Sequence, residues 1–187
     1  MILLAGVAFA KMSTQPPRVP LEDVIVQPQA IGRAAGGAAG TGGFLALSQT
    51  LANAPELALQ RLVETAMKLS GAESAGVSVE DSDNGVQVFR WVATAGEFSR
   101  YLQGTMPREF SPCGTVLNRG KTLVMRDPAR HYEYISDLHA PITYALLVPF
   151  GRNRRLVGTV WVLRHRHAKP FTDEDVRAVE GLTIFST

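Results

Sequence analysis

The sequence holds a single cysteine, Cys113, among its 187 residues. One cysteine excludes an internal disulfide and any cysteine-rich zinc site, and it favours a reducing cytoplasm as the compartment. Excess charge is also missing, since 19 Lys and Arg against 17 Asp and Glu leave a net charge of only +2. That balance gives no general reason to expect binding to nucleic acid or to a membrane surface.

Long hydrophobic runs are absent as well. The apolar stretch over residues 1–10 is far shorter than the about 20 residues that span a bilayer. Ala8-Phe9-Ala10 resembles a signal-peptidase site, but no positive segment precedes the stretch and Lys11 follows it. An export signal and a true start at Met12 both stay open, and we expect a cytoplasmic protein. No Ser-His-Asp or paired-carboxylate arrangement stands out, so we expect no enzymatic activity.

Composition divides the chain into a tail over residues 1–43 and a domain over residues 44–187. The tail contains a proline-rich stretch at 15–20 and a glycine-rich stretch at 32–43. Such segments have few side chains with which to build a core. A phosphate-binding loop is disfavoured, because no strand precedes the glycines and no Gly-Lys-Ser/Thr closes them.

The domain alternates between helical and strand patterns. A capped start at Asn53-Ala54-Pro55-Glu56 opens a helix that Gly71 ends, and Thr172-Asp173-Glu174-Asp175 opens a last helix. Between them, turn residues and period-two alternation predict two antiparallel hairpins and one further strand. The pattern predicts an α+β fold with a five- or six-stranded antiparallel sheet. The segments expected as strands are 74–80, 86–93, 122–125, 144–150 and 156–163.

A short helix bears the cysteine. Ser111 offers an N-cap oxygen, Pro112 fits the first helical position, and Gly120 can end the helix in the left-handed conformation. Cys113 therefore falls in the first turn, where free N–H groups and the helix dipole favour a thiolate.

These motifs, in this order, resemble those of a GAF domain, over about Ala54 to Phe185. The closest likeness is to the sensory GAF domains at the N-terminus of bacterial sensor histidine kinases. The resemblance implies terminal helices on one face of the sheet and, on the other, a lid over residues 95–143 that encloses a small-molecule pocket. It also implies a homodimer and a kinase or other effector as partner. The helix residues expected at the dimer interface are Leu59, Leu62, Val63, Ala66, Val176 and Val179.

The lid region contains the candidate ligand contacts, because a ligand pocket needs a few convergent polar groups among apolar walls. The candidates are Cys113, Arg126, His131, Tyr132, Tyr134, Asp137 and His139. No metal site is expected, since His131 and His139 are eight residues apart and His165 and His167 resemble an exposed basic strand end.

The chemistry of Cys113 has several interpretations. A free cysteine commonly packs as a small apolar residue. Phytochrome-like GAF domains attach a bilin cofactor to a cysteine in a comparable helix, although there a histidine usually follows where this chain has Gly114. Free-methionine-sulfoxide reductases carry a Cys-Gly at this helix but depend on further cysteines, and single-thiol redox sensing is a further alternative. The cofactor and the ligand stay unidentified.

Overall fold

The structure, a computed structural model, describes residues 17–29, 57–152, 155–166 and 169–183. At its centre is one sheet in which every pair of neighbouring strands is antiparallel. The spatial order of the strands is β1-β5-β6-β7-β2-β3-β4. The strands are β1 (Ile25–Val26), β2 (Ser74–Asp83), β3 (Val86–Gly96), β4 (Thr105–Pro107), β5 (Leu123–Arg126), β6 (Tyr144–Arg152) and β7 (Arg155–Arg164).

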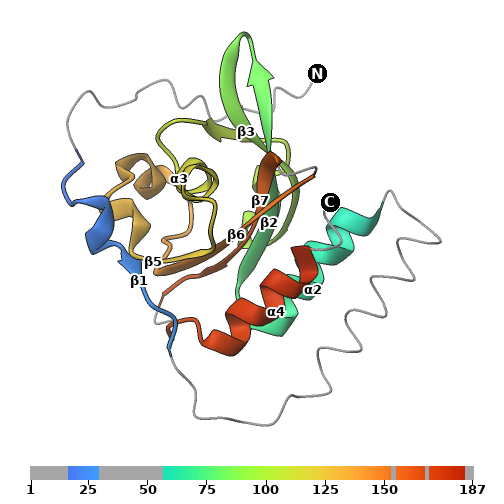
Figure 1. The fold of residues 1–187 in the computed structure, drawn as a ribbon, viewed down its shortest axis with the longest axis vertical. Helices are drawn as coiled ribbons and strands as arrows, with labels where there is room; N and C mark the ends of the chain where they lie inside the picture. Colours follow the sequence, from blue (N-terminus) through green and yellow to red (C-terminus); the bar gives the residue numbers. More distant parts are fainter. Residues whose placement is uncertain (1–16, 30–56, 153–154, 167–168, 184–187) are drawn as a thin grey trace.

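The helices cover both faces of this sheet. Helices α2 (Ala58–Ser70) and α4 (Asp173–Thr183) lie side by side on one face, and α3 (Pro112–Arg119) lies on the other (Figure 1). The α+β class is confirmed, as is the placement of terminal helices and lid on opposite faces. The short 3-10 turns are η1 (Leu21–Asp23), η3 (Glu97–Tyr101), η4 (Pro128–Arg130) and η5 (Glu133–Asp137).

Seven strands are present in the described residues, where the sequence predicted five or six. The two additional strands, β1 and β4, are two and three residues long and lie at opposite edges of the sheet. Such short segments cannot show a period of two, and Pro107 in β4 is a residue that sheets tolerate at their edges.

The predicted tail is part of the folded unit over residues 17–29. Ile25 pairs with Met125 and Val26 with Val124, and Val24 is completely buried. The apolar run from Val24 to Val26 is too short to show a period of two. The predicted boundary at residues 43 and 44, like the predicted capped start at residues 53–56, lies outside the described residues.

The helix-covered face contains one of the two hydrophobic cores. Apolar side chains of α2 and α4 pack there against alternate residues of the central strands. Arg164 joins these elements, because its guanidinium donates to the Ser70 carbonyl at the end of α2 and pairs with Asp175 of α4 at 3.2 Å. Thr172 and Asp175 form the predicted capping box at the start of α4.

Four of the six residues expected at the dimer interface are buried within their own chain. Leu62, Val63, Ala66 and Val179 are at most 1% exposed, because they form the contact between the terminal helices and the sheet of their own chain. Leu59 and Val176 are half-buried against the same core. An apolar helical stripe covers a sheet as readily as it covers a second copy, and the homodimer itself stays a prediction.

Candidate functional site

A bulge in β3 decides which side chains reach the lid face of the sheet. Val77 pairs with Ala93 and Ser78 pairs with Trp91, so Val92 has no partner in β2. One extra residue reverses the alternation of faces along a strand. Ala93 therefore packs on the helix side, whereas Trp91 packs on the lid side.

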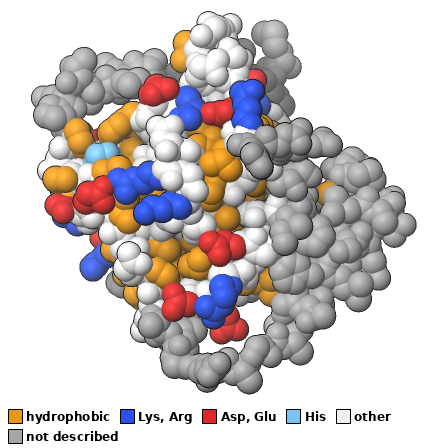
Figure 2. All heavy atoms as spheres, in the orientation of Figure 1, with side chains coloured by type: hydrophobic (Ala, Val, Ile, Leu, Met, Phe, Trp, Pro, Cys, Tyr) orange, Lys and Arg blue, Asp and Glu red, His pale blue; other side chains and the backbone are white. Residues whose placement is uncertain are grey.

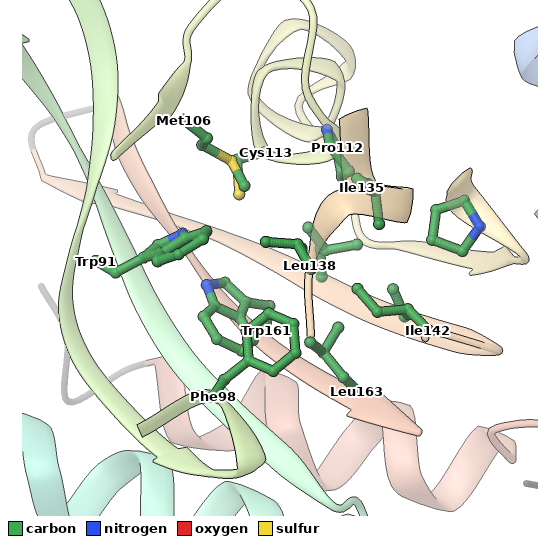
Figure 3. A pocket seen from close by; sticks show the side chains of 13 residues that line it. Trp91, Phe98, Met106, Pro112, Cys113, Ile135, Leu138, Ile142, Trp161 and Leu163 are labelled. Atoms are coloured by element: carbon green, nitrogen blue, oxygen red, sulfur yellow. The ribbon is translucent and has the colours of Figure 1, made fainter. Parts of the chain in front are cut away.

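A cavity lies between the sheet and the lid, with a volume of about 40 Å³. Its lining side chains are aliphatic, aromatic or sulfur-bearing, and Figure 3 shows them converging from both layers. The sheet supplies Trp91, Ala145, Leu147, Trp161 and Leu163. The lid supplies Pro112, Cys113, Pro128, Ile135, Leu138 and Ile142, and Phe98 and Met106 complete the wall.

Trp161 forms part of the cavity wall because its ring lies directly over Gly76. A β-carbon at Gly76 would overlap the Trp161 ring, so only glycine permits this position. The indole Nε1 of Trp161 donates to Ser78 Oγ at 2.8 Å. The Ser74–Ser78 strand segment therefore supplies both the space and the hydrogen bond that fix Trp161.

Cys113 is held in place by the predicted helix start. Ser111 Oγ accepts from the Gly114 N–H at 3.0 Å, Pro112 occupies the first helical position and Gly120 ends α3 with φ of 62°. Any side chain at Gly114 would overlap the Arg108 carbonyl. Close packing of the chain therefore requires a glycine directly after Cys113.

The cysteine is a buried thiol. Its side chain is buried beside Thr159, whose Oγ1–H donates to Sγ at 3.2 Å. Burial raises the pKa of Cys113, and this outweighs the hydrogen bonds from Thr159 and Ser78 and the charge of Arg108, which lower it. The helix turn alone favours a thiolate, but the burial of Cys113 agrees with the interpretation of a cysteine that packs as a small apolar residue.

Of the seven predicted ligand contacts, Cys113 alone lines this cavity. His131 donates from Nδ1 to the Val19 carbonyl at 2.8 Å, and Tyr132 Oη shares a 2.6 Å hydrogen bond with Thr115 Oγ1. Burial raises the pKa of Tyr132 to about 12. His131 therefore joins the lid to segment 17–29, and Tyr132 joins its part of the lid to α3.

The other four predicted contacts also lie outside the lining. Tyr134 packs edge-on against Phe110, and burial raises its pKa. Asp137 and His139 are exposed, and the exposed Arg126 pairs with Asp127 at 3.5 Å. The 3-10 turn η5 directs Ile135 inward, and Leu138 directly after it is also buried, so apolar lid residues occupy the position that we assigned to polar ones. Ligand contact by these polar residues stays a prediction.

His165 was expected at an exposed strand end and is instead 3% exposed. Its Nδ1 donates to the Pro141 carbonyl at 2.7 Å, and its Nε2 shares a 2.8 Å hydrogen bond with Ser74 Oγ. The ring stacks on Phe98, which lines the cavity. A histidine among arginines gives no sequence signal for this burial, and His167 lies outside the described residues.

The described residues show neither a metal-ligand cluster nor, on the face drawn in Figure 2, a patch of one charge. On the face seen in Figure 2, acidic and basic side chains are interspersed. Among the described residues, no three His, Cys, Asp or Glu side chains are grouped to hold a metal ion. Within that same part of the chain, no helix is both long and apolar enough to cross a membrane.

A family model described as GAF domain matches residues 52–183. The chain belongs to the GAF domain family. The match begins after β1, so residues 17–29 are an addition to the matched GAF region. No curated protein matches the chain.

Solved structures share the GAF fold at low identity. The GAF domain from a phosphoenolpyruvate-protein phosphotransferase of Coxiella burnetii has a TM-score of 0.67 at 18% identity, covering 79% of this chain and 91% of that one. The free methionine-R-sulfoxide reductase of Neisseria meningitidis, in complex with its substrate, has a TM-score of 0.63 at 16% identity, covering 83% and 91%. The chromophore-binding domain of Stigmatella aurantiaca phytochrome P1 has a TM-score of 0.63 at 14% identity, covering 84% and 62%.

Proposed function

We propose that this GAF domain is a non-enzymatic regulatory module that binds a small, uncharged, mostly apolar ligand. The observation that carries the proposal is the cavity between sheet and lid, whose lining side chains carry no formal charge. When an apolar ligand binds, its surface leaves water and contacts Trp161, Leu138 and their neighbours. This transfer is favourable and buries no ion. The module relays its occupancy to a partner or effector, in a histidine-kinase two-component context.

The size of the cavity implies that binding moves the lid. Micromolar affinity requires about 8 kcal/mol, and even the best small ligands gain only about 1.5 kcal/mol per heavy atom. A useful ligand therefore has at least about six heavy atoms, which is the size of benzene, and benzene occupies a cavity of about 150 Å³. Because this cavity measures about 40 Å³, Ile135, Leu138 and Ile142 must shift outward when the ligand binds.

This displacement provides the signal. A ligand changes a conformational equilibrium only if it binds the two states unequally, and here it fits only the state with the displaced lid. The strands β6 and β7 contact the cavity through Leu147 and Trp161 and contact the terminal helices through Leu146 and Val160. The output thus passes from the lid through these shared strands to α2 and α4.

Two alternatives receive less support from the cavity. A bilin is at least drug-sized and would need a pocket of about 300 Å³ or more, whereas the cavity beside the Cys113 thiol measures about 40 Å³. Free methionine sulfoxide carries two charges, which the cavity side chains leave uncompensated. Measuring sulfoxide turnover by the wild type and by Cys113→Ala tests the enzymatic alternative.

Benzene tests the cavity directly. At ten times its Kd, it should stabilise the wild type by about 1.4 kcal/mol and raise Tm by about 3–5 °C. Ala145→Leu fills the cavity from β6 and should abolish the rise. Val86→Leu, at a position 63% exposed on the β2–β3 hairpin, should keep it. If benzene leaves the Tm of the wild type unchanged, the proposed function is overturned.

A further inference from the structure

Trp91 is a cavity residue whose ring is held on several sides. Its ring centroid lies 5.7 Å from that of Tyr101 and 6.3 Å from those of Phe98 and Trp161, all in edge-on geometry. Its backbone N–H donates to the Gly104 carbonyl at 2.9 Å. The indole orientation is therefore set before any ligand arrives.

The indole N–H of Trp91 is unsatisfied. The side chain is 2% exposed, and Nε1 has no hydrogen-bond partner within the part of the chain that the structure describes. The chain's other tryptophan, Trp161, donates its N–H to Ser78. Buried donors in folded proteins are nearly always paired, so this donor requires an explanation. In Figure 3, the indole nitrogen lies on the ring edge that faces Cys113 and Met106.

A trapped water does not explain the donor well. The cavity exceeds the about 10–15 Å³ that one water requires, but a stable buried water makes about three hydrogen bonds. Apart from the Trp91 N–H, the side chains that line the cavity offer only the Cys113 thiol and the Met106 thioether as weak polar partners. A better partner is an acceptor atom on an otherwise apolar molecule.

Building on the proposed function, we propose that the ligand is a neutral carbonyl compound with a hydrocarbon body, whose oxygen accepts a hydrogen bond from Trp91 Nε1. The hydrocarbon part contacts the aliphatic lid residues, and the oxygen lies at the Trp91 edge. A carboxylate is excluded from this class, because no charged side chain lines the cavity to pair with it.

The test compares cyclopentanone with methylenecyclopentane, which have the same shape but differ in the acceptor oxygen. The full-length protein is titrated with each probe and Kd is measured for the wild type and for Trp91→Phe. The variant should bind cyclopentanone about tenfold more weakly than the wild type, while its affinity for methylenecyclopentane stays within about twofold. For each probe, the Kd of Trp91→Phe is divided by the Kd of the wild type. The difference in hydration between the two probes cancels in these ratios.

A spectroscopic readout keeps the test decisive if Trp91→Phe does not fold. The chain has two indole N–H protons, and that of Trp91 in the wild type should shift downfield with cyclopentanone but not with methylenecyclopentane. If both probes bind and the Trp91 N–H responds to neither, the carbonyl assignment is overturned while the apolar cavity site stands. If neither these probes nor benzene binds, both proposals are overturned.

Discussion

At the scale of single residues, Cys113 is the clearest case of two opposed effects. The first turn of α3 favours a thiolate by about 0.3–2 kcal/mol. Full burial raises a pKa by up to about 3–5 units, which corresponds to roughly 4–7 kcal/mol. Burial therefore dominates, and the direction of the pKa shift follows from it. The helix-start motif indicates only the smaller of these two effects.

Alkylation of Cys113 by iodoacetamide provides the corresponding prediction. The folded-state pKa of the thiol lies above the free value of about 8.5. The contribution of the neutral thiol to folding stability is therefore fully present below that pH, and it is lost as the pH rises further. Between pH 7 and 8.5 the folded protein should react at least about tenfold more slowly than the unfolded one. Mass spectrometry reports one site, since the chain has one cysteine. An apparent pKa below 8.5 in the folded state would restore the redox and bilin interpretations.

The two tryptophans show what sequence reasoning misses at this scale. Both fall on predicted strands, and packing is the natural first assumption for each. Their difference depends on Ser78, which accepts from Trp161, and on the bulge at Val92, which brings Trp91 to the lid face. Neither the acceptor nor the bulge has a signal in a single sequence.

At the scale of elements, α3 was predictable because its boundaries depend on local chemistry. Each residue that sets a boundary acts on backbone groups within about one helical turn of itself. The roles of Ser111, Pro112 and Gly120 can therefore be inferred from spacing alone. The lid turns η4 and η5 were not predictable in the same way. Their three to five residues are too short for a helical period, and the direction of Ile135 depends on the sheet beneath it.

Loss of the α3 cap should destabilise the domain by a defined amount. Ser111→Ala removes the acceptor of the buried Gly114 N–H and should lower the free energy of unfolding by about 1 kcal/mol. Ser111→Gly, which is a better N-cap than alanine, should cost only a few tenths of a kcal/mol. Urea denaturation of the three proteins measures both differences. Equal costs for Ala and Gly would show that the cap does not set the stability of α3.

At the scale of the whole molecule, one sheet supports two cores with different tasks. The helix-side core was predictable from the apolar stripes of α2 and α4 and from strand alternation. The sequence could not show that these stripes face the sheet of the same chain, because an apolar stripe carries no information about its partner. The edges of the sheet were equally hidden, since β1 pairs with β5 across about 100 residues of sequence.

Removing β1 should expose the β5 edge. A protein that begins at residue 30 lacks Val24 and both residues of β1, so the backbone of Val124 and Met125 becomes an unpaired strand edge. We expect a lower Tm and concentration-dependent self-association, measured by size-exclusion chromatography with light scattering. A protein that begins at residue 17 keeps every described contact and serves as the control. Identical masses and Tm values for the two proteins would contradict this role of β1.

The segment 17–29 connects parts of the molecule that are otherwise separate. Arg18 pairs with Glu133 in η5, Glu22 pairs with Arg119 in α3, and the Gln29 backbone bonds to residues on both sides of Thr172 at the start of α4. These thirteen consecutive residues thus connect the lid over the cavity to α4 on the opposite face of the sheet. Segment 17–29 could be detached by a protease cut or by a competing protein. Its detachment would loosen the lid and α4 together, without any molecule entering the cavity.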